Sequence, residues 1–446
     1  SIMSYCGLGG PVVFKLASGT YYDMAFTGTY PGTDSVKTVT FTSTADNADS
    51  VIFTGITYGL SITNAANLRF HKISVNFFNI NYGINITDSC RNIEISHCNI
   101  IGDPTTTATR YGIRYYNTTT GSDNIRIIHN TINGGYYGMY IYGASAMRPT
   151  RFVVDSNIVT NQYYYGINTY YTNYISISHN VVKARILGAN AYWYGMYNYY
   201  NDINLIDGNI VHSLSPTVTN PYGMYLQYVN NTVANALVSN NEVIITTSST
   251  YYGIYPSNSN LSIVNNSVLV KGTGAGRALY ITSSANNYDV FNNNLITLAA
   301  AGAYPIYLGA TTYLGTSWFI DYNNYYTNGT YIGYAGGNRN TLALWKGAVS
   351  TDINSVNIYP QFLDESLTLT MRLYKNTGLT CPINGSVLYD INANARTSTT
   401  SMGAYEFTPI AHNTLVSSFV RPTASISSPG DTLHVEVKIK NKSDST

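Results

Sequence analysis

The sequence predicts an all-β solenoid, a stack of short strands in which one small unit recurs along the chain. Three observations predict it. A tyrosine-glycine phrase recurs roughly every 27 residues, within the range of periods typical of repeat architectures. An alternating apolar phrase follows each copy, and most copies end in an asparagine. A period of this length indicates a stack of supersecondary units rather than an ordinary globular fold.

The first phrase is Tyr-Gly followed by Leu, Ile or Met, and it is expected to form a strand. The aliphatic residue points inward, and by strict alternation the residues on either side of it point outward. The glycines are therefore expected to leave a shallow channel beside an aromatic wall. Copies begin at Tyr58, Tyr82, Tyr111, Tyr137, Tyr165, Tyr194, Tyr222 and Tyr252, and the phrase then decays to Arg277-Ala278-Leu279 and Tyr304-Pro305-Ile306.

The second phrase alternates apolar and polar residues, as in residues 93–100, 125–132 and 152–158. Period-two alternation is typical of a strand with one buried face. A polar corner interrupts each copy before another apolar residue begins. Each coil of the solenoid is therefore expected to contain three short strands.

The corner contains a column of asparagines, with interruptions expected at Cys98 and Gly208. Asparagine tolerates left-handed backbone and bonds neighbouring backbone at turns. Stacked at the strand spacing of about 4.8 Å, such side chains can also bond one another. We therefore expect a structural role for this column, which consists of Asn130, Asn157, Asn180, Asn241, Asn266, Asn293 and Asn323.

Coils of three strands, with an asparagine corner and an inward Ile/Val/Leu stack, resemble the right-handed parallel β-helix of the pectate-lyase-like superfamily. The resemblance covers about residues 10–325 and implies about 9–11 coils. It divides the chain into a start or cap at residues 1–57 and the β-helix proper at residues 58–326.

The two ends resemble secreted and cell-surface β-helix proteins of Bacteroidetes-type bacteria. Residues 327–409 are similar to their C-terminal cap, in which Trp345, Phe362 and Tyr405 are expected to plug the last coil. Residues 410–446 resemble the beginning of an immunoglobulin-like β-sandwich, too short to complete one, so a longer parent protein is expected. The resemblance implies export by the type nine secretion route. The motifs that carry it are Gly10-Pro11-Val12-Val13-Phe14 with Gly19-Thr20-Tyr21, Asp352-Ile353-Asn354-Ser355, Arg396 and Gly403-Ala404-Tyr405-Glu406-Phe407.

Composition narrows the function classes. Charged residues make up 10% of the chain and the formal net charge is +1, so electrostatics favours neither nucleic acid nor an anionic membrane. There is no apolar run of about 18 residues that would span a bilayer. Cys90 and Cys98 either form a bridge or are two buried thiols. The cysteines lack metal-type spacing, and no cofactor is expected.

Histidines and carboxylates are the residues that could form a catalytic or metal site. His97, His129 and His179 share the position before the asparagine, and stacking would place the first two on adjacent coils. A zinc site normally has three or more protein ligands, which favours solvated corner histidines. Asp155 and Asp207 are expected in different corner positions, and there is no evident carboxylate pair with the separation of about 5 to 9.5 Å that glycosidases use. We therefore predict neither a catalytic nor a metal site.

The tyrosines, 44 in number, supply the candidate binding surface. Residues after the inward aliphatic form two outward columns. Their rings either stack as ladders that stabilise the sheet or form a contact surface for sugars or protein. The candidate ligand-binding residues are Arg114, Tyr116, Tyr140, Tyr142, Tyr170, Tyr197, Tyr199, Tyr225 and Tyr255.

Three functions remain open. The leading one is a non-catalytic module of a large secreted or cell-surface protein, acting in adhesion, glycan binding or surface display. Its partner would be a polysaccharide or surface glycan, or other subunits of a cell-surface assembly. The alternative is a polysaccharide lyase or glycoside hydrolase using the outer groove. The third is a structural spacer.

Overall fold

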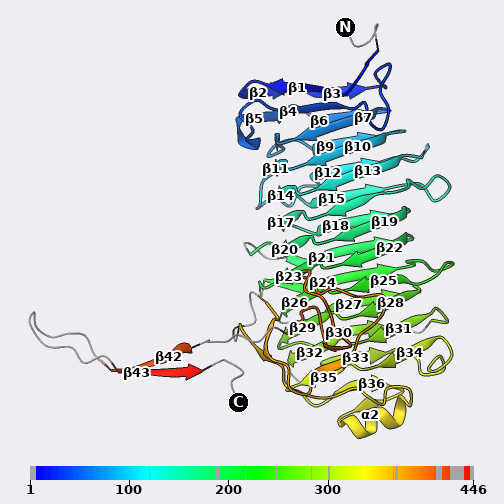
Figure 1. The fold of residues 1–446 in the computed structure, drawn as a ribbon, viewed down its shortest axis with the longest axis vertical. Coiled ribbons are helices and arrows are strands. Elements are labelled where there is room, and N and C mark those ends of the chain that lie inside the picture. Colours follow the sequence, from blue (N-terminus) through cyan, green and yellow to red (C-terminus); the bar gives the residue numbers. More distant parts are fainter. Residues whose placement is uncertain are drawn as a thin grey trace, which may run out of the picture.

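The computed structural model describes residues 7–407, except 120, 187, 189, 216, 248, 283, 300, 301, 365 and 367–369, together with the strands at 414–421 and 436–441. The chain forms a rod of stacked coils, with the first strands at one end and the helix α2 (Leu342–Ala348) at the other (Figure 1). Each coil contributes one strand to each of three parallel sheets, which we call A, B and C. The predicted all-β parallel solenoid with three strands per coil is confirmed.

Sheet A contains strands with the alternating apolar phrase. In spatial order they are β1 (Val12–Leu16), β4 (Val39–Ser43), β7 (Ala66–His71), β10 (Arg91–Ser96), β13 (Asp123–Ile128), β16 (Val153–Asp155), β19 (Asn173–Ser178), β22 (Asp202–Asp207), β25 (Ala236–Ser239), β28 (Leu261–Val264), β31 (Tyr288–Phe291) and β34 (Trp318–Asp321).

Sheet B contains the strands that follow the asparagine corner. They are β2 (Gly19–Tyr22), β5 (Val51–Thr54), β8 (Ser74–Asn76), β11 (Asn99–Ile101), β14 (Thr131–Asn133), β17 (Ile158–Gln162), β20 (Val181–Ala184), β23 (Ile210–Ser213), β26 (Glu242–Thr247), β29 (Ser267–Gly272), β32 (Asn294–Ala299) and β35 (Asn324–Thr327).

Sheet C contains the tyrosine-glycine strands and ends in one antiparallel pair, β36 with β37. Its strands are β3 (Met24–Thr27), β6 (Tyr58–Thr63), β9 (Tyr82–Thr87), β12 (Tyr111–Tyr116), β15 (Tyr137–Tyr142), β18 (Tyr165–Tyr170), β21 (Asn190–Tyr199), β24 (Val218–Gln227), β27 (Tyr251–Ser257), β30 (Gly276–Ile281), β33 (Tyr304–Leu308), β36 (Gly333–Ala335) and β37 (Asn338–Arg339).

The interior of the rod is one continuous hydrophobic cluster. In a typical coil, Ile125 and Ile127 of sheet A, Ile132 of sheet B and Met139 and Ile141 of sheet C are all fully buried. Burying each such side chain stabilises the fold by about 1.5–3 kcal/mol. Because every coil places aliphatic side chains at the same register, the core runs along the whole stack.

The asparagine corner lies between sheets A and B and forms an unbroken ladder. The Oδ1 atom of each asparagine accepts a hydrogen bond from the backbone N–H and from Nδ2 of the asparagine one coil before it, at 2.9–3.0 Å. The ladder ends where Asn323 N–H donates to Ser355 Oγ at 2.7 Å. We call this set, Asn130, Asn157, Asn180, Asn209, Asn241, Asn266, Asn293 and Asn323, the asparagine ladder.

The interruption predicted at Gly208 is wrong, because Asn209 occupies that rung. Strand β22 has two irregularities against β19: Tyr174 is unpaired before the pair Ile175–Ile203, and Asn204 is unpaired before the pair Ser176–Leu205. Counted from Ile203, Asn204 therefore moves the corner one place along the chain. The other expected interruption, at Cys98, is real, although Asn130 Oδ1 still accepts from the Cys98 N–H at 2.9 Å.

The helix α2 follows the last coil, and its Trp345 is fully buried in the main core cluster. The Trp345 ring lies 5.3 Å from the Tyr325 ring, and its Nε1–H donates to Asp352 Oδ2 at 2.6 Å. Trp345 thus lies where an end plug was expected.

Phe362 and Tyr405 do not plug the end, which corrects the expectation. They belong to a second hydrophobic cluster with Ile244, Leu269 and Ile296, which are sheet B residues of β26, β29 and β32. Sheet B presents aliphatic side chains outward at these three coils, and the chain folds back along the rod to cover them. We call residues 361–407 the returning segment.

The returning segment contains two small antiparallel sheets, β38 (Gln361–Phe362) with β39 (Leu373–Lys375), and β40 (Thr380–Pro382) with β41 (Thr399–Ser401). Ala404 N–H donates to Ser267 Oγ, and the Arg396 guanidinium donates to Asn240 Oδ1. A short 3-10 helix, η1 (Ala48–Ser50), precedes β5. Two strands of the proposed immunoglobulin-like part, β42 (Thr414–Arg421) and β43 (Glu436–Asn441), pair antiparallel, and its other residues lie outside the described part.

Cys90 and Cys98 are buried free thiols, so they do not form a bridge. Burial raises the pKa of Cys90 to about 11 and that of Cys98 to about 12, which makes both unreactive as nucleophiles. Within the described residues, α2 is far too short to cross a bilayer, and no other helix is long and apolar enough to do so.

Candidate binding face on sheet C

The glycine of the Tyr-Gly phrase is buried and opens no channel, which corrects the sequence prediction. A Cβ on Gly138 would lie 2.5 Å from Val159 Cγ1 and 2.6 Å from the carbonyl oxygen of Gly166 in the next coil. The same contacts, to a Val or Ile of sheet B and the next carbonyl, recur at Gly112, Gly166 and Gly223. The chain bends here from sheet B into sheet C, so strict alternation fails and the glycine points into the rod.

The tyrosine before that glycine faces outward, which the sequence argument missed. Its ring contacts the outward tyrosine three residues later, as Tyr137 does with Tyr140 at 5.1 Å between centroids. The repeat of the phrase itself was the available signal. This column consists of Tyr58, Tyr82, Tyr111, Tyr137, Tyr165, Tyr194, Tyr222, Tyr252 and Tyr304, with Arg277 between the last two.

Two further columns have the predicted register and complete the face. The second column is Tyr140, Asn168, Tyr197, Tyr225, Tyr255, Tyr280, Tyr307 and Tyr334, preceded by Asn85 and Arg114. The third is Tyr116, Tyr142, Tyr170 and Tyr199, continued by Gln227 and Ser257. We call the tyrosines of these three columns the tyrosine array.

Neighbouring rings in the first column stack along the rod axis. Tyr111 and Tyr137 are 4.7 Å apart at 6°, Tyr137 and Tyr165 are 5.1 Å apart at 7°, and Tyr194 and Tyr222 are 4.6 Å apart at 13°. The flat faces of these rings are therefore turned toward neighbouring coils and occupied by stacking. Rings of the second column are tilted against one another, by 55° for Tyr197 with Tyr225 and by 39° for Tyr255 with Tyr280.

Partial burial keeps these phenols neutral. Desolvation, together with the neighbouring tyrosines, raises the pKa of Tyr222 to about 12. The same causes raise the pKa values of Tyr137, Tyr140 and Tyr197. A neutral hydroxyl both donates and accepts, so at neutral pH the face offers both functions at each ring.

Two arginines lie within the columns of this face. The Arg114 guanidinium lies 4.3 Å from the Tyr116 ring centroid, and that of Arg277 lies 4.7 Å from the Tyr307 ring centroid. Arg114 also donates to Asn85 Oδ1 at 2.9 Å. The three columns contain no Asp or Glu, so the charges on the described part of this face are positive.

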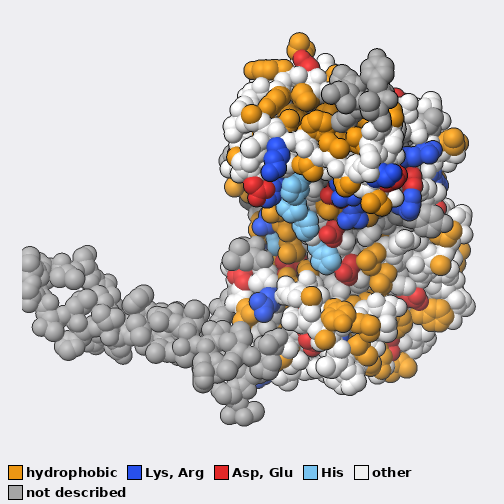
Figure 2. All heavy atoms as spheres, turned by 45° about the horizontal axis from the view of Figure 1, so that its top comes forward, with side chains coloured by type: hydrophobic (Ala, Val, Ile, Leu, Met, Phe, Trp, Pro, Cys, Tyr) orange, Lys and Arg blue, Asp and Glu red, His pale blue; other side chains and the backbone are white. Residues whose placement is uncertain are grey.

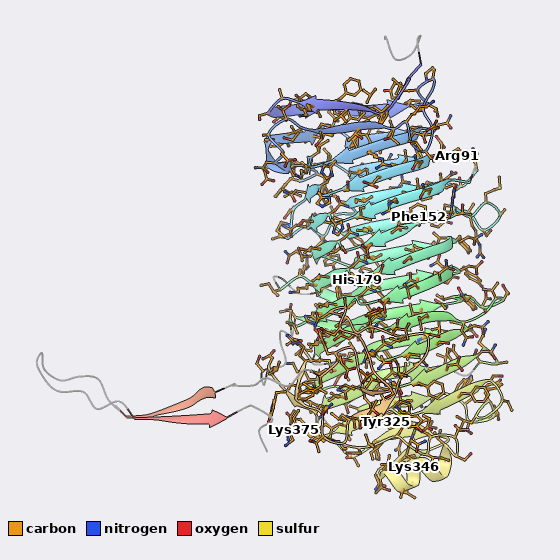
Figure 3. The ribbon with its side chains drawn as sticks, viewed as in Figure 1. Arg91, Phe152, His179, Tyr325, Lys346 and Lys375 are labelled. Carbon is orange, nitrogen blue, oxygen red and sulfur yellow. The ribbon has the colours of Figure 1, made fainter. Side chains whose placement is uncertain are left out.

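A second cluster of candidate residues lies at the corner between sheets A and B. Asp155 and Asp207 occupy the same position two coils apart, since both pair with Ser178. The expectation of different positions is wrong for the reason given for Asn209. His179 lies between them, with Nδ1 3.1 Å from Asp155 Oδ1 and Nε2 4.0 Å from Asp207 Oδ2. Figure 3 marks His179 near mid-height of the rod.

These carboxylates are already engaged. Desolvation acts to raise the pKa of Asp155, but hydrogen bonds from His179, Ser178 and Ser156 outweigh it and the pKa is lowered. Asp207 accepts from Ser239 and Asn240. The His179 imidazole occupies the space between the two carboxylates. The cluster therefore has a structural role at the corner and does not have the arrangement of two acids on either side of a sugar bond.

His97 and His129 lie on adjacent coils as predicted, with ring centroids 4.9 Å apart, and His71 continues the row at 4.9 Å from His97. Figure 2 shows histidine side chains as a pale-blue row with charged residues beside it. Desolvation and the neighbouring histidine lower the pKa of both His71 and His97. In the described part of the chain, no group of three or more His, Cys, Asp or Glu is placed to hold a metal ion.

The structure brings the predicted ligand-binding residues together on one face. Arg114 and Tyr116 lie at one end of it, and Tyr140, Tyr197, Tyr225 and Tyr255 lie in the second column. Tyr142, Tyr170 and Tyr199 lie in the third. Sequence reasoning missed the whole first column and Arg277.

Comparisons with known proteins indicate that the β-helix is right-handed. No curated protein matches the chain. A mannuronic acid specific polysaccharide family 6 lyase from human gut microbiota is 13% identical over 73% of this chain and 83% of its own, with a TM-score of 0.40. The surface adhesin PfbA of Streptococcus pneumoniae is 12% identical over 64% and 85%, with a TM-score of 0.34. The Dettilon tailspike protein is 13% identical over 73% and 61%, with a TM-score of 0.33.

These structural similarities are too low to carry an argument on function. The family model for the right handed beta helix region matches residues 111–296. That span contains most of the tyrosine array and most of the asparagine ladder. The chain therefore contains a right-handed β-helix region at residues 111–296.

Proposed function

We propose that this protein is a non-catalytic β-helix module whose tyrosine array binds glycan, in adhesion or surface display. One observation carries the proposal. The array exposes a grid of neutral hydroxyls that the protein itself hardly uses. Tyr197 donates to Gln227 and Arg277 donates to Tyr252, each at 3.4 Å, and Tyr304 donates to Asn338 at 2.9 Å. Most of the other array hydroxyls are neither bonded to protein nor among the buried polar atoms.

Such a surface suits a hydroxyl-rich polymer. A sugar chain lying on the face would exchange hydrogen bonds with the phenols, and its C–H groups would contact the ring edges. Rings held by stacking have little conformational freedom left to lose on binding, which lowers the entropic cost of association. Arg114 and Arg277 add further hydrogen-bond donors to the face.

Glycan-array binding tests the proposal. The variant Tyr140→Ser/Tyr197→Ser/Tyr225→Ser is compared with the wild-type protein at a temperature where both are folded by circular dichroism. We expect the wild-type protein to bind a set of glycans and the variant to lose them. If the variant loses only stability while binding the same glycans, or the wild-type protein binds none, the array is a structural spacer surface.

The alternative, a polysaccharide lyase or glycoside hydrolase, has less support from the geometry. The three columns lack carboxylates, and Asp155 and Asp207 are held by His179 and nearby hydroxyls and amides. A reducing-sugar assay and an unsaturated-product assay on the array-positive glycans test it. Cleavage that disappears with Asp155→Asn or Asp207→Asn would replace the binding proposal with an enzymatic one.

Location and organisation are proposed from the resemblances in the sequence. We infer a secreted or cell-surface protein of Bacteroidetes type, exported by the type nine route. Its parts are a start at 1–57, a β-helix at 58–326, a cap region at 327–409 and the beginning of an immunoglobulin-like module at 410–446. The full gene product tests this, because a type nine sorting domain is expected in it.

A further inference from the structure

The second column of the tyrosine array contains one interruption. Between Tyr140 and Tyr334 every coil contributes a tyrosine except the coil of β18, which contributes Asn168. Strands are about 4.8 Å apart, so Tyr140 and Tyr197 lie about 9.6 Å apart on either side of it. The gap therefore has the width that one flat ring occupies in the rest of the column.

The side chain beneath this gap is unusual. Asn168 is only 1% exposed, yet neither its Oδ1 nor its Nδ2 has a hydrogen-bond partner. A buried amide without partners is costly, and native proteins rarely keep one without a reason. Strand register places this amide on the outer face, under the array, not in the aliphatic core.

Tyr170 covers the gap. Its column neighbours are Tyr142 and Tyr199, but its ring also contacts Tyr140 at 6.1 Å and Tyr197 at 5.6 Å. In the coils before and after, the second-column and third-column rings lie nearly parallel, at 10° for Tyr140 with Tyr142 and 9° for Tyr197 with Tyr199. Tyr170 is instead tilted by 44–58° to all four neighbours.

Desolvation raises the pKa of the Tyr170 hydroxyl, while hydrogen-bonding interactions with the Asn168 and Tyr197 side chains act in the opposite direction. The hydroxyl therefore lies close to the Asn168 amide, although the contact does not have the geometry of a full hydrogen bond. The interruption in the first column differs, because Arg277 fills its own place with a guanidinium 4.7–5.5 Å from three tyrosine rings. At Asn168 only a neighbouring ring, leaning over, fills the space.

We propose that Asn168 is the base of a closed sugar-binding slot and that Tyr170 is its lid. When Tyr170 turns back into line with Tyr142 and Tyr199, the facing sides of Tyr140 and Tyr197 become available to a pyranose ring. The Asn168 amide then donates to one sugar hydroxyl and accepts from another. The closed state reduces the apparent affinity by the fraction of molecules in which the slot is shut. The inference rests on the proposed glycan binding and assigns it one specific subsite.

Two variants, which are expected to change the thermal midpoint in opposite directions, test the slot. Asn168→Tyr supplies the missing ring and removes the unpartnered amide, so its thermal midpoint should rise. Its affinity for the array-positive glycans should fall by about tenfold or more, since the slot is filled. Tyr170→Ala removes the lid, so its thermal midpoint should fall while its affinity stays equal or improves. Thr87→Tyr, which extends the third column by one ring three coils from Asn168, is the control and should leave affinity unchanged.

A monosaccharide separates the slot from the face as a whole. The probe is the side-chain amide signal of Asn168 in 15N-labelled Tyr170→Ala, titrated to 100 mM with the methyl glycosides of glucose, galactose, mannose and N-acetylglucosamine, a concentration suited to millimolar or weaker binding. A saturable shift with at least one glycoside supports the slot even if the glycan array is blank, in which case only the wider proposal fails. The slot is overturned, and face-wide binding stands, if no glycoside shifts the signal and Asn168→Tyr binds the array-positive glycans as the wild-type protein does.

Discussion

The asparagine ladder and the tyrosine array are built alike, with one residue type repeated at the strand spacing, but they differ in how much of their bonding capacity the fold uses. Ladder amides are buried, and each both accepts from the preceding rung and donates to the next. Array tyrosines are half-buried and use their faces for stacking, while most hydroxyls remain free for solvent. A column whose polar groups all form hydrogen bonds within the protein has a structural role. A column whose polar groups remain without protein partners can also bind a ligand.

The largest difference between the two columns is expected at alkaline pH. The tyrosines of the array ionise there, whereas the asparagines of the ladder do not. Unfolded tyrosine ionises near pH 10, while burial raises the pKa of Tyr222 in the fold to about 12. Stability is therefore complete below pH 10 and is lost as the pH rises toward 12. Each such ring contributes about 1 kcal/mol after allowance for solvent screening.

The measurement is the thermal midpoint between pH 8 and pH 12, with phenolate absorbance followed in parallel. Because many rings titrate together, we expect cooperative unfolding coupled to ionisation. Tyr194→Phe/Tyr222→Phe should hold its midpoint to higher pH than the wild-type protein. A midpoint that stays constant through pH 12, or phenolates that form near pH 10 in an intact fold, would show that the rings are not buried as described.

Removing one rung of the ladder should have the next largest effect. Asn180→Ala leaves the Asn157 N–H and Nδ2 without their acceptor and frees the Val154 carbonyl. We expect a loss of about 2–4 kcal/mol in the free energy of unfolding. Urea denaturation checks it, with the exposed Asn204→Ala as the control. Equal stability of the two variants would contradict the structural role of the ladder.

Filling a glycine position beneath the array should cost less. The Cβ of Gly138→Ala meets Val159 and the Gly166 carbonyl, so we expect a destabilisation of about 1–3 kcal/mol. The control is Gly347→Ala in α2, where a Cβ meets nothing within 4 Å and should stabilise by about 0.5–1 kcal/mol. If Gly138→Ala were as stable as the wild-type protein, the glycine would not point into the rod. The surface channel predicted from the sequence would then be supported.

The sequence was sufficient for the solenoid, the three strands per coil and the register of the second and third tyrosine columns. Those features depend on periodicity alone. Prediction from the sequence failed where a single residue shifts the repeat or the inward-outward alternation. Asn204 is an extra residue between Ile203 and the corner. Counting from Ile203 therefore assigned Asn209 and Asp207 to the wrong corner positions. The bend before Gly138 breaks the alternation, which hid the first column.

The slot at Asn168 also could not be predicted from the sequence. An asparagine in a tyrosine column can be read from the repeat, but its burial, its lack of partners and the lean of Tyr170 depend on packing across three coils. The fold-back of Phe362 and Tyr405 is similar, since the outward aliphatic residues of sheet B that they cover belong to coils far earlier in the chain.

Glycan binding by Tyr140→Phe/Tyr197→Phe/Tyr225→Phe tests the central claim most directly. The variant keeps the rings and their stacking and removes only three outward hydroxyls, of which Tyr197 alone bonds to protein, through Gln227. We expect an unchanged thermal midpoint at neutral pH together with loss of binding on the glycan array. Unchanged binding, or a midpoint that falls as far as it does for Asn180→Ala, would contradict it.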